Sequence, residues 1–242
     1  MAADLDGPGK VGKGTALAAV TAAALFPTLA TWLYFVALPG SRWTTLVFAV
    51  CKVLQFTFPL IWVLGVERSH PRLWTWPSRR GLGAGLLSGV AILAGIVLLW
   101  ELFLEGTALA GRAGEAASAK LSAFGIETVG GYLLLAVFYS VFHSLLEEYY
   151  WRWFVLGHLR RHVPDTSAVL LSSLAFMSHH VLVVGEFVGG YGPLTWILAS
   201  SVAVCGLIWS WLYQRSHSLS GPWLSHALAD VALLWIGFGM WR

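Results

Sequence analysis

Seven long apolar runs divide this chain of 242 residues, and they constrain its fold more than any other feature. An α-helix rises about 1.5 Å per residue, so a helix that crosses about 30 Å of hydrocarbon needs about 20 apolar residues. The runs that meet this length are residues 15–38, 43–66, 82–104, 131–156, 167–188, 194–213 and 222–241. We therefore predict an all-α fold, a polytopic transmembrane helix bundle of about seven spans.

Charged residues are too scarce for a protein that folds in water. They make up 11% of the chain, and hydrophobic residues make up 57%. A soluble domain carries about 25% charged residues. The chain therefore has too little polar surface to cover a water-soluble globule. We predict a short cytoplasmic tail, residues 1–14, followed by one integral membrane domain, residues 15–242, in the cell membrane and in contact with its lipid bilayer.

The Lys and Arg residues near the span ends predict the orientation, because cytoplasmic loops carry an excess of these cations. With the N-terminus in the cytoplasm, the inside segments hold Lys10, Lys13, Arg68, Arg72, Arg79, Arg80, Arg160, Arg161 and Arg215. The outside segments hold only Arg42, Arg112, Lys120 and Arg242. We read the net charge of +3 as a sign of topology and expect no nucleic-acid partner.

Three further features of the sequence lead to predictions about the loops, the cysteines and the first span. The longest loop, residues 105–130, is rich in Ala, Gly and Glu, which permits a short surface helix on the outer side. Cys51 and Cys205 lie within spans, where we expect small apolar side chains and not a disulfide or a metal pair. The first run is longer than a signal-peptide core and lacks a clear cleavage site, so we expect a retained helix.

Ionisable residues inside the spans are the strongest sign of function, because each costs about 2.5–3.5 kcal/mol on insertion scales. The stretch LLEEYYWRWF, residues 145–154, carries Glu147, Glu148 and Arg152. Glu148 and Arg152 are four residues apart, so they share a helix face and can pair. Glu147 points about 100° away and remains available as a general base. The alternative interpretation is an ion cluster that only locks helices together.

Two later spans carry further polar residues. His179 and His180 are adjacent in the fifth span, and His226 lies four residues before Asp230 in the seventh. At that spacing an aspartate can fix the tautomer of a histidine, or the two can share a ligand. The alternatives are a packed histidine and a polar pair that satisfies itself. Depths counted along the helices allow all these residues to share one cavity that opens toward the cytoplasm.

Other polar residues in or near the spans are weaker candidates. Lys52, midway along the second span beside Gln55, could pair with a carboxylate such as Glu101 or extend toward the interface. His143 lies four residues before Glu147 and could touch the same site, although we expect it to serve packing. The remaining histidines are placed in cytoplasmic loops and expected to be solvated: His70, His158, His162 and His217.

Three motifs follow one another on separate apolar helices. They are EEYYWR, which contains Glu147, Glu148 and Arg152; FMSHH, which ends at His180; and HALAD, which runs from His226 to Asp230. This order resembles the CAAX-protease and bacteriocin-processing family of intramembrane proteases, whose pattern is EExxxR, FxxxH and HxxxN or HxxxD. The resemblance covers roughly residues 131–241, and the first three spans carry no motif that matches it.

The resemblance implies a helical membrane peptidase that acts from the cytoplasmic side. It implies that Glu147 activates a water molecule with help from His180, that Glu148 and Arg152 support the site, and that His226 and Asp230 line the oxyanion region. The FxxxH spacing selects His180 over His179. Many members carry Asn where this chain has Asp230; an aspartate can donate a hydrogen bond only when protonated, so it could instead orient His226 or help to hold a metal.

We therefore predict a glutamate-type intramembrane endopeptidase with no cofactor and no metal. A metal-dependent form would use Glu147, His180 and His226 as ligands, with Asp230 as an optional fourth. A proton-coupled transporter and a non-catalytic membrane protein that binds a partner helix are the alternatives from other classes. The expected substrate is a protein or peptide: a prenylated C-terminal peptide, a leader peptide or the anchor of a C-terminally sorted protein.

Overall fold

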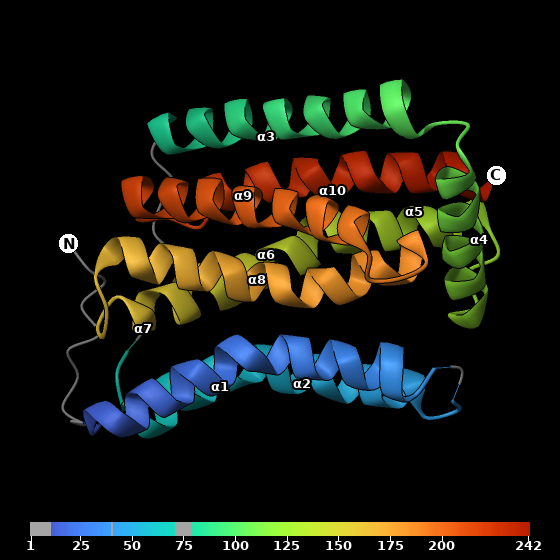
Figure 1. Cartoon of the computed structure of the whole chain (residues 1–242). Coiled ribbons are helices and arrows are strands. Elements are labelled where there is room, and N and C mark those ends of the chain that lie inside the picture. Colours follow the sequence, from blue (N-terminus) through green and yellow to red (C-terminus); the bar gives the residue numbers. More distant parts are fainter. Residues whose placement is uncertain (1–10, 40, 71–78) are drawn as a thin grey trace.

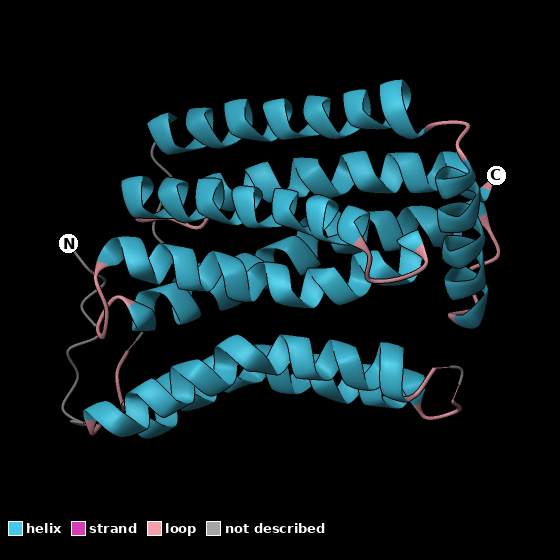
Figure 2. Ribbon diagram, viewed as in Figure 1, coloured by secondary structure: helices cyan, strands magenta, loops and turns pink. Residues whose placement is uncertain are grey.

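A computed structural model describes residues 11–39, 41–70 and 79–242, and all regular structure in these ranges is helical. Figure 2 shows the helices joined by short loops at the two ends of the molecule. Within the described residues, seven segments are long and apolar enough to cross a membrane: Lys13–Ala37, Thr44–Val66, Arg79–Leu104, Val129–Leu159, Asp165–Val188, Pro193–Ser216 and Ser220–Trp241. The predicted fold class is confirmed. Lys10, Arg72 and most of the predicted tail lie outside the described residues.

The spans run side by side in alternating directions, so that the first span begins and the last span ends at opposite ends of the bundle (Figure 1). The first three spans each end in a wider π-helical turn. The bounds of these six segments are α1 Lys13–Trp32, η1 Leu33–Ala37, α2 Thr44–Ile61, η2 Trp62–Val66, α3 Arg79–Leu99 and η3 Trp100–Leu104. The last three spans are single helices: α8 Asp165–Val188, α9 Pro193–Ser216 and α10 Ser220–Trp241.

The fourth span changes its helical type four times. It consists of α5 Val129–Val137, η4 Phe138–His143, α6 Ser144–Glu148, η5 Tyr149–Leu156 and α7 Gly157–Leu159. Every residue from Tyr150 to Leu156 is buried, because η5 contacts α1, α2, α8 and α9. By contrast, Leu134 in α5, Leu87 in α3 and Trp235 in α10 each expose more than 70% of their surface, as side chains that face lipid would. The fourth span therefore passes from a lipid-facing segment into the centre of the bundle.

A short helix crosses the end of the bundle at which the C-terminus lies (Figure 1). It is α4, Ala108–Ala123, and it confirms the helix predicted in the loop 105–130. The Thr107 side chain caps its start by accepting a hydrogen bond from the Ala110 amide at 3.2 Å. Lys120 near its end forms an ion pair of 3.4 Å with Glu186 of α8. The ion pair attaches α4 to α8.

A line of glycines brings α3 close to α10. A methyl group on Gly85 would collide with the Gly221 carbonyl oxygen, and one on Gly89 would lie 2.9 Å from the Ser225 Cα. Small residues spaced by four allow membrane helices to approach in this way. This spacing was not among the features predicted from the sequence. The close approach that it allows holds α10, which carries His226, in place.

We predict that Gly85→Ala destabilises the protein by about 1–3 kcal/mol, the usual cost of forcing extra atoms into a filled contact. Gly83→Ala is the matched control, since nothing lies within 4 Å of a methyl group at that position of the same helix. Thermal unfolding of the purified proteins in one detergent measures both. Equal unfolding temperatures for the two variants would contradict the tight contact between α3 and α10.

Candidate active site

Glu148 and Arg152 form a buried ion pair at the centre of the bundle. Arg152 Nη1 lies 3.2 Å from Glu148 Oε1, and both side chains are at most 1% exposed. The guanidinium also donates a hydrogen bond of 3.4 Å to the Gly206 carbonyl oxygen. It lies over the rings of Phe176 and Trp209, at 4.9 Å and 5.2 Å from their centres. The pairing predicted from the four-residue spacing is confirmed, and the charges are compensated within one turn of helix.

The same carboxylate orients His226. His226 Nδ1 lies 2.8 Å from Glu148 Oε1, so its N–H donates to the carboxylate, and the Nε2 atom is turned toward the other acidic groups. Trp209 stacks on the imidazole with 4.0 Å between ring centres and 15° between planes. Ser225 accepts a hydrogen bond of 3.0 Å from Trp209 Nε1, which fixes the indole in turn. Glu148 therefore has a second role that the sequence analysis did not assign to it.

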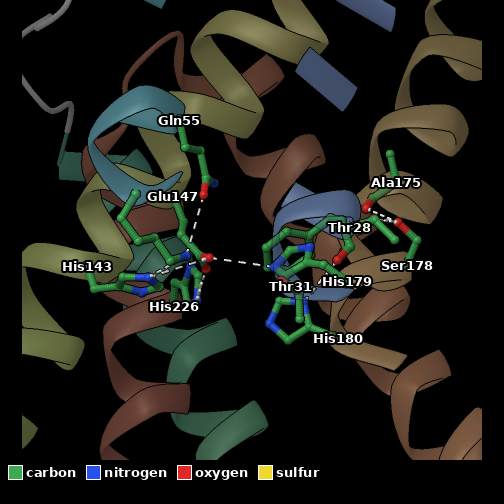
Figure 3. A network of polar contacts seen from close by, with 12 residues as sticks. Thr28, Thr31, Gln55, His143, Glu147, Ala175, Ser178, His179, His180 and His226 are labelled. Atoms are coloured by element: carbon green, nitrogen blue, oxygen red, sulfur yellow. Dashed lines mark hydrogen bonds and ion pairs between the residues drawn. The ribbon is translucent and has the colours of Figure 1, made fainter. Parts of the chain in front are cut away.

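Glu147 lies among three imidazole rings (Figure 3). Its oxygens are 3.9 Å from His143 Nε2, 3.8 Å from His179 Nε2 and 3.7 Å from His226 Nε2. The carboxylate is only 4% exposed, and each of these separations is slightly longer than a hydrogen bond. His143, for which we expected a packing role, thus belongs to the site. Glu147 is a buried carboxylate without a cation bound directly to it, which distinguishes it from Glu148.

The two adjacent histidines of α8 occupy different environments. His179 approaches Glu147 and lies flat against Trp151, with 1° between the ring planes and 5.7 Å between their centres. His180 packs beside it, and its Nδ1 donates a hydrogen bond of 2.9 Å to the Phe176 carbonyl oxygen. His179 is buried and His180 is half-buried. The motif spacing therefore points to His180, whereas the short approach to Glu147 is made by His179.

Asp230 is the third acidic residue that the motifs bring to the site. Its Oδ1 lies 3.8 Å from His226 Nε2, one helical turn away on α10. Its side chain is 19% exposed, so it lies at the edge of the site. The tautomer of His226 is set by Glu148 on the Nδ1 side, at a shorter distance than Asp230 reaches. Asp230 therefore faces the ring nitrogen that is left free for chemistry.

Polar residues of the second span also reach the site, although the sequence analysis found no role for them. Lys52 Nζ lies 3.5 Å from His143 Nε2 and 3.5 Å from Gln55 Oε1. Gln55 is 2% exposed and appears beside Glu147 in Figure 3. The pairing of Lys52 with Glu101 considered from the sequence is not found. Glu101 lies instead on a cavity of about 780 Å³ beneath α4, which is lined by none of the motif residues.

A second polar cluster joins two helix ends at the N-terminal end of the bundle. The Glu67 carboxylate accepts hydrogen bonds of 3.2 Å from Trp62 Nε1, 3.2 Å from His158 Nε2 and 2.9 Å from Arg161 Nη1. His158 also contacts the Phe154 carbonyl oxygen through Nδ1 at 2.7 Å. The prediction that His158 is solvated is therefore wrong, because it is 1% exposed.

The other three histidines of the predicted cytoplasmic loops differ from His158. His70 and His217 are exposed, and His162 is half-buried. The wrong prediction for His158 arose because the fourth helical span extends to Leu159 and not to residue 156, which carries this imidazole inward beside η2.

This cluster predicts a loss of stability in acid. Burial alone would raise the pKa of the Glu67 carboxyl, but the hydrogen bond and charge of His158, with Arg161, hold that pKa below its ordinary value. A carboxyl with a lowered folded pKa stabilises the protein above the unfolded pKa of about 4.3 and loses that contribution as the pH falls below it. We expect the unfolding temperature of the native protein to fall more between pH 5 and pH 3 than that of Glu67→Gln. Equal falls would contradict the prediction.

The alternative of a metal site requires several ligand side chains to face one point. In the part of the chain that the structure describes, no group of three or more His, Cys, Asp or Glu side chains is arranged to hold a metal ion. His180, one of the ligands considered, packs against His179 and Phe176.

The comparisons with known proteins agree with the motifs. The model of the family described as type II CAAX prenyl endopeptidase, Rce1-like, matches residues 129–232, which span all three motifs. No curated protein and no solved structure matches the chain. The match confirms the resemblance drawn from Glu147, His180 and His226 in their order. Residues 129–232, which carry all the motif residues around Glu147, are therefore similar to the Rce1-like family of type II CAAX prenyl endopeptidases.

Proposed function

We propose that the chain is an intramembrane endopeptidase that cleaves a peptide bond near the end of a membrane-associated protein, with a water molecule as the nucleophile. One observation carries the proposal: the Glu147 carboxylate lies buried among three imidazoles, while the neighbouring Glu148 is compensated by Arg152. The first carboxylate can accept a proton, and the second keeps its charge. The family match supports protease activity of this class.

The proposed reaction begins with Glu147. Its carboxylate takes a proton from water, and the hydroxide attacks the peptide carbonyl carbon. The electrons of the carbonyl double bond move to its oxygen, which becomes the oxyanion. When the tetrahedral intermediate collapses, the carbon–nitrogen bond breaks, and the leaving amine receives a proton from the Glu147 carboxylic acid. His180 assists these proton transfers, as the motif implies. Its Nδ1 hydrogen bond to a backbone carbonyl leaves Nε2 free to exchange a proton.

The developing oxyanion requires a donor, and His226 is the proposed one. Glu148 accepts its Nδ1–H at 2.8 Å and so stabilises the imidazolium form, in which Nε2 also carries a proton. That proton can be donated to the oxyanion. Asp230, 3.8 Å from Nε2, supports the same protonated state. This assignment makes Glu148 and Arg152 positioning residues that act through His226.

The substrate is proposed from the family and from the location of the site. A prenylated C-terminal peptide is the first candidate, and a leader peptide or a C-terminal anchor are the others. The test compares the membrane and secreted proteomes of cells that carry the native chain or Glu147→Gln, scored by their terminal peptides. A protein that accumulates unprocessed in the variant identifies the substrate and the cleavage site together. Identical proteomes, with the variant folded and abundant, would reject the peptidase.

The roles of the two α8 histidines are separated by a pair of variants. We expect His180→Gln to lower kcat by about a hundredfold, the lower part of the range for acid–base groups. His179 is buried flat against Trp151, so we expect His179→Gln to have the smaller effect on kcat. Cleavage of the identified substrate by the purified variants measures both. A larger loss with His179→Gln would transfer the assisting role to that residue.

A further inference from the structure

Lys52 is a cation in the middle of a span that lacks a partner of opposite charge. Its ammonium contacts two neutral groups, His143 Nε2 and Gln55 Oε1, each at 3.5 Å. In the described part of the chain, no carboxylate lies within 4.0 Å of it. An ammonium at this depth is expensive to hold without an anion. Arg152, the other cation of the site, already has Glu148.

A donor without a hydrogen-bond partner lies beside it. The Gln55 side chain is 2% exposed, and its Oε1 faces the Lys52 ammonium. Its Nε2 is buried and has no hydrogen-bond partner. Buried polar atoms without partners are uncommon, and each one needs a reason. Gln55 Nε2 belongs to the same amide as the oxygen that Lys52 contacts, so the two donors are close to each other. The two oxygens of a carboxylate can accept hydrogen bonds from an ammonium and from an amide.

These donors lie close to the proposed reaction centre. His143 Nε2 is 3.5 Å from Lys52 Nζ and 3.9 Å from Glu147 Oε1. The ammonium is therefore no more than about 8 Å from the carboxylate that would activate water. An extended chain advances about 3.3–3.6 Å per residue. An anion held by Lys52 would thus lie a few residues from the peptide bond at Glu147.

We propose that Lys52, with Gln55, binds the C-terminal carboxylate of the peptide substrate and so sets the cleavage point a few residues from the chain end. The inference rests on the proposed peptidase function. The C-terminal carboxylate is the anion that every unmodified peptide carries, whatever its side chains. An apolar C-terminal segment can enter the membrane domain, and its terminal charge then meets the one cation in the described site that has no acidic partner.

A different role for Lys52 would be to hold Glu147 in its charged form. That role would affect the hydrolysis of every substrate equally, because Glu147 acts on all of them. Binding of the C-terminal carboxylate would affect only substrates that carry one. The ratio between the two kinds of substrate therefore separates the two roles.

The test uses short apolar peptides of mixed sequence, made once with a free C-terminal carboxylate and once as C-terminal amides. The full-length protein in lipid nanodiscs is given both sets, and the products are measured by mass spectrometry. We expect kcat/KM to be about ten- to a hundredfold higher for the acids, the range of a charge-assisted hydrogen bond. Lys52→Met should reduce this preference, Lys52→Arg should keep part of it, and Lys120→Met at the other end of the molecule should keep all of it.

The outcomes distinguish the inference from the function on which it rests. Equal cleavage of acids and amides by the native protein would overturn the role of Lys52 while leaving the peptidase intact, and this comparison does not depend on the folding of any variant. A preference for the acids that survives in folded Lys52→Met would also overturn it. Absence of cleavage in both sets, with the native protein folded, would contradict the peptidase itself and the inference with it.

Discussion

Glu147→Gln is expected to lower kcat for peptide cleavage by at least about a hundredfold, and up to about ten-thousandfold, which is the range for a positioned acid–base group. Glutamine has nearly the same shape, so the three imidazoles that lie 3.7–3.9 Å from Glu147 keep their packing. It cannot accept the proton of an attacking water. We therefore expect the loss to appear in kcat, with little change in the unfolding temperature.

The matched control for this variant is Glu186→Gln. Glu186 lies on α8, is 30% exposed on its side chain, and pairs with Lys120 away from the site. The same loss of one carboxylate there is expected to leave cleavage unchanged. Purified proteins are compared on one substrate and by thermal unfolding. A Glu147→Gln enzyme that retains most of the native kcat would remove Glu147 from the role of general base.

Arg152→Met should have the largest effect on stability. The substitution keeps an apolar stem of similar length but leaves the Glu148 carboxylate, which is 0% exposed, without its cation. Breaking one side of a buried ion pair costs about 3–5 kcal/mol, because the remaining charge is uncompensated. The contacts of the guanidinium with Phe176 and Trp209 are lost as well. We expect a marked fall in unfolding temperature and in the yield of folded protein.

The double variant Glu148→Gln with Arg152→Met tests the cause of that loss. Replacing both partners by neutral groups removes the uncompensated charge, so most of the stability should return. Cleavage should stay low, because the amide can no longer stabilise a protonated His226. If the double variant is no more stable than Arg152→Met, packing of the guanidinium and not its charge would be the main contribution.

The helical architecture and the ion pair between Glu148 and Arg152 could be predicted from the sequence by simple rules. Apolar length predicted all the spans, because the thickness of a bilayer sets the number of residues that a helix needs. The spacing of Glu148 and Arg152 predicted their ion pair, because both residues belong to one turn. The order of the three motifs predicted the family that the comparison found.

The contributions of the first two spans could not be predicted in the same way. Lys52 and Gln55 approach His143 only because α2 packs beside the fourth span, and no spacing within one helix reveals which helices are neighbours. α1 also reaches the site region, since the Thr28 hydroxyl lies 2.5 Å from that of Ser178 on α8. The only sign in the sequence was a charged residue within an apolar run. It drew attention to Lys52 but did not indicate what Lys52 does.

The helical type of the fourth span was the other feature that could not be predicted from the sequence. The π-helical segments η4 and η5 enclose the short α6, which carries Glu147 and Glu148. Such wide turns are rare, and they are often found at functional sites. A helical wheel of constant pitch therefore misplaces side chains along this span. The angle of about 100° between the two glutamates holds within α6, but it cannot be extended to the aromatic residues of η5.

The position of the fourth span in the chain has a consequence for biosynthesis. Its residues Glu148 and Arg152 pair within one turn, so their two charges can compensate each other as soon as the span is made. His179 and His226, which complete the surroundings of Glu147, belong to spans that leave the ribosome later. During insertion the nascent helix therefore presents one unpaired carboxylate, that of Glu147, to the translocon and not three separate charges. The order of synthesis therefore matches the order of electrostatic compensation, which lets a helix this polar enter a membrane before α8 and α10 exist.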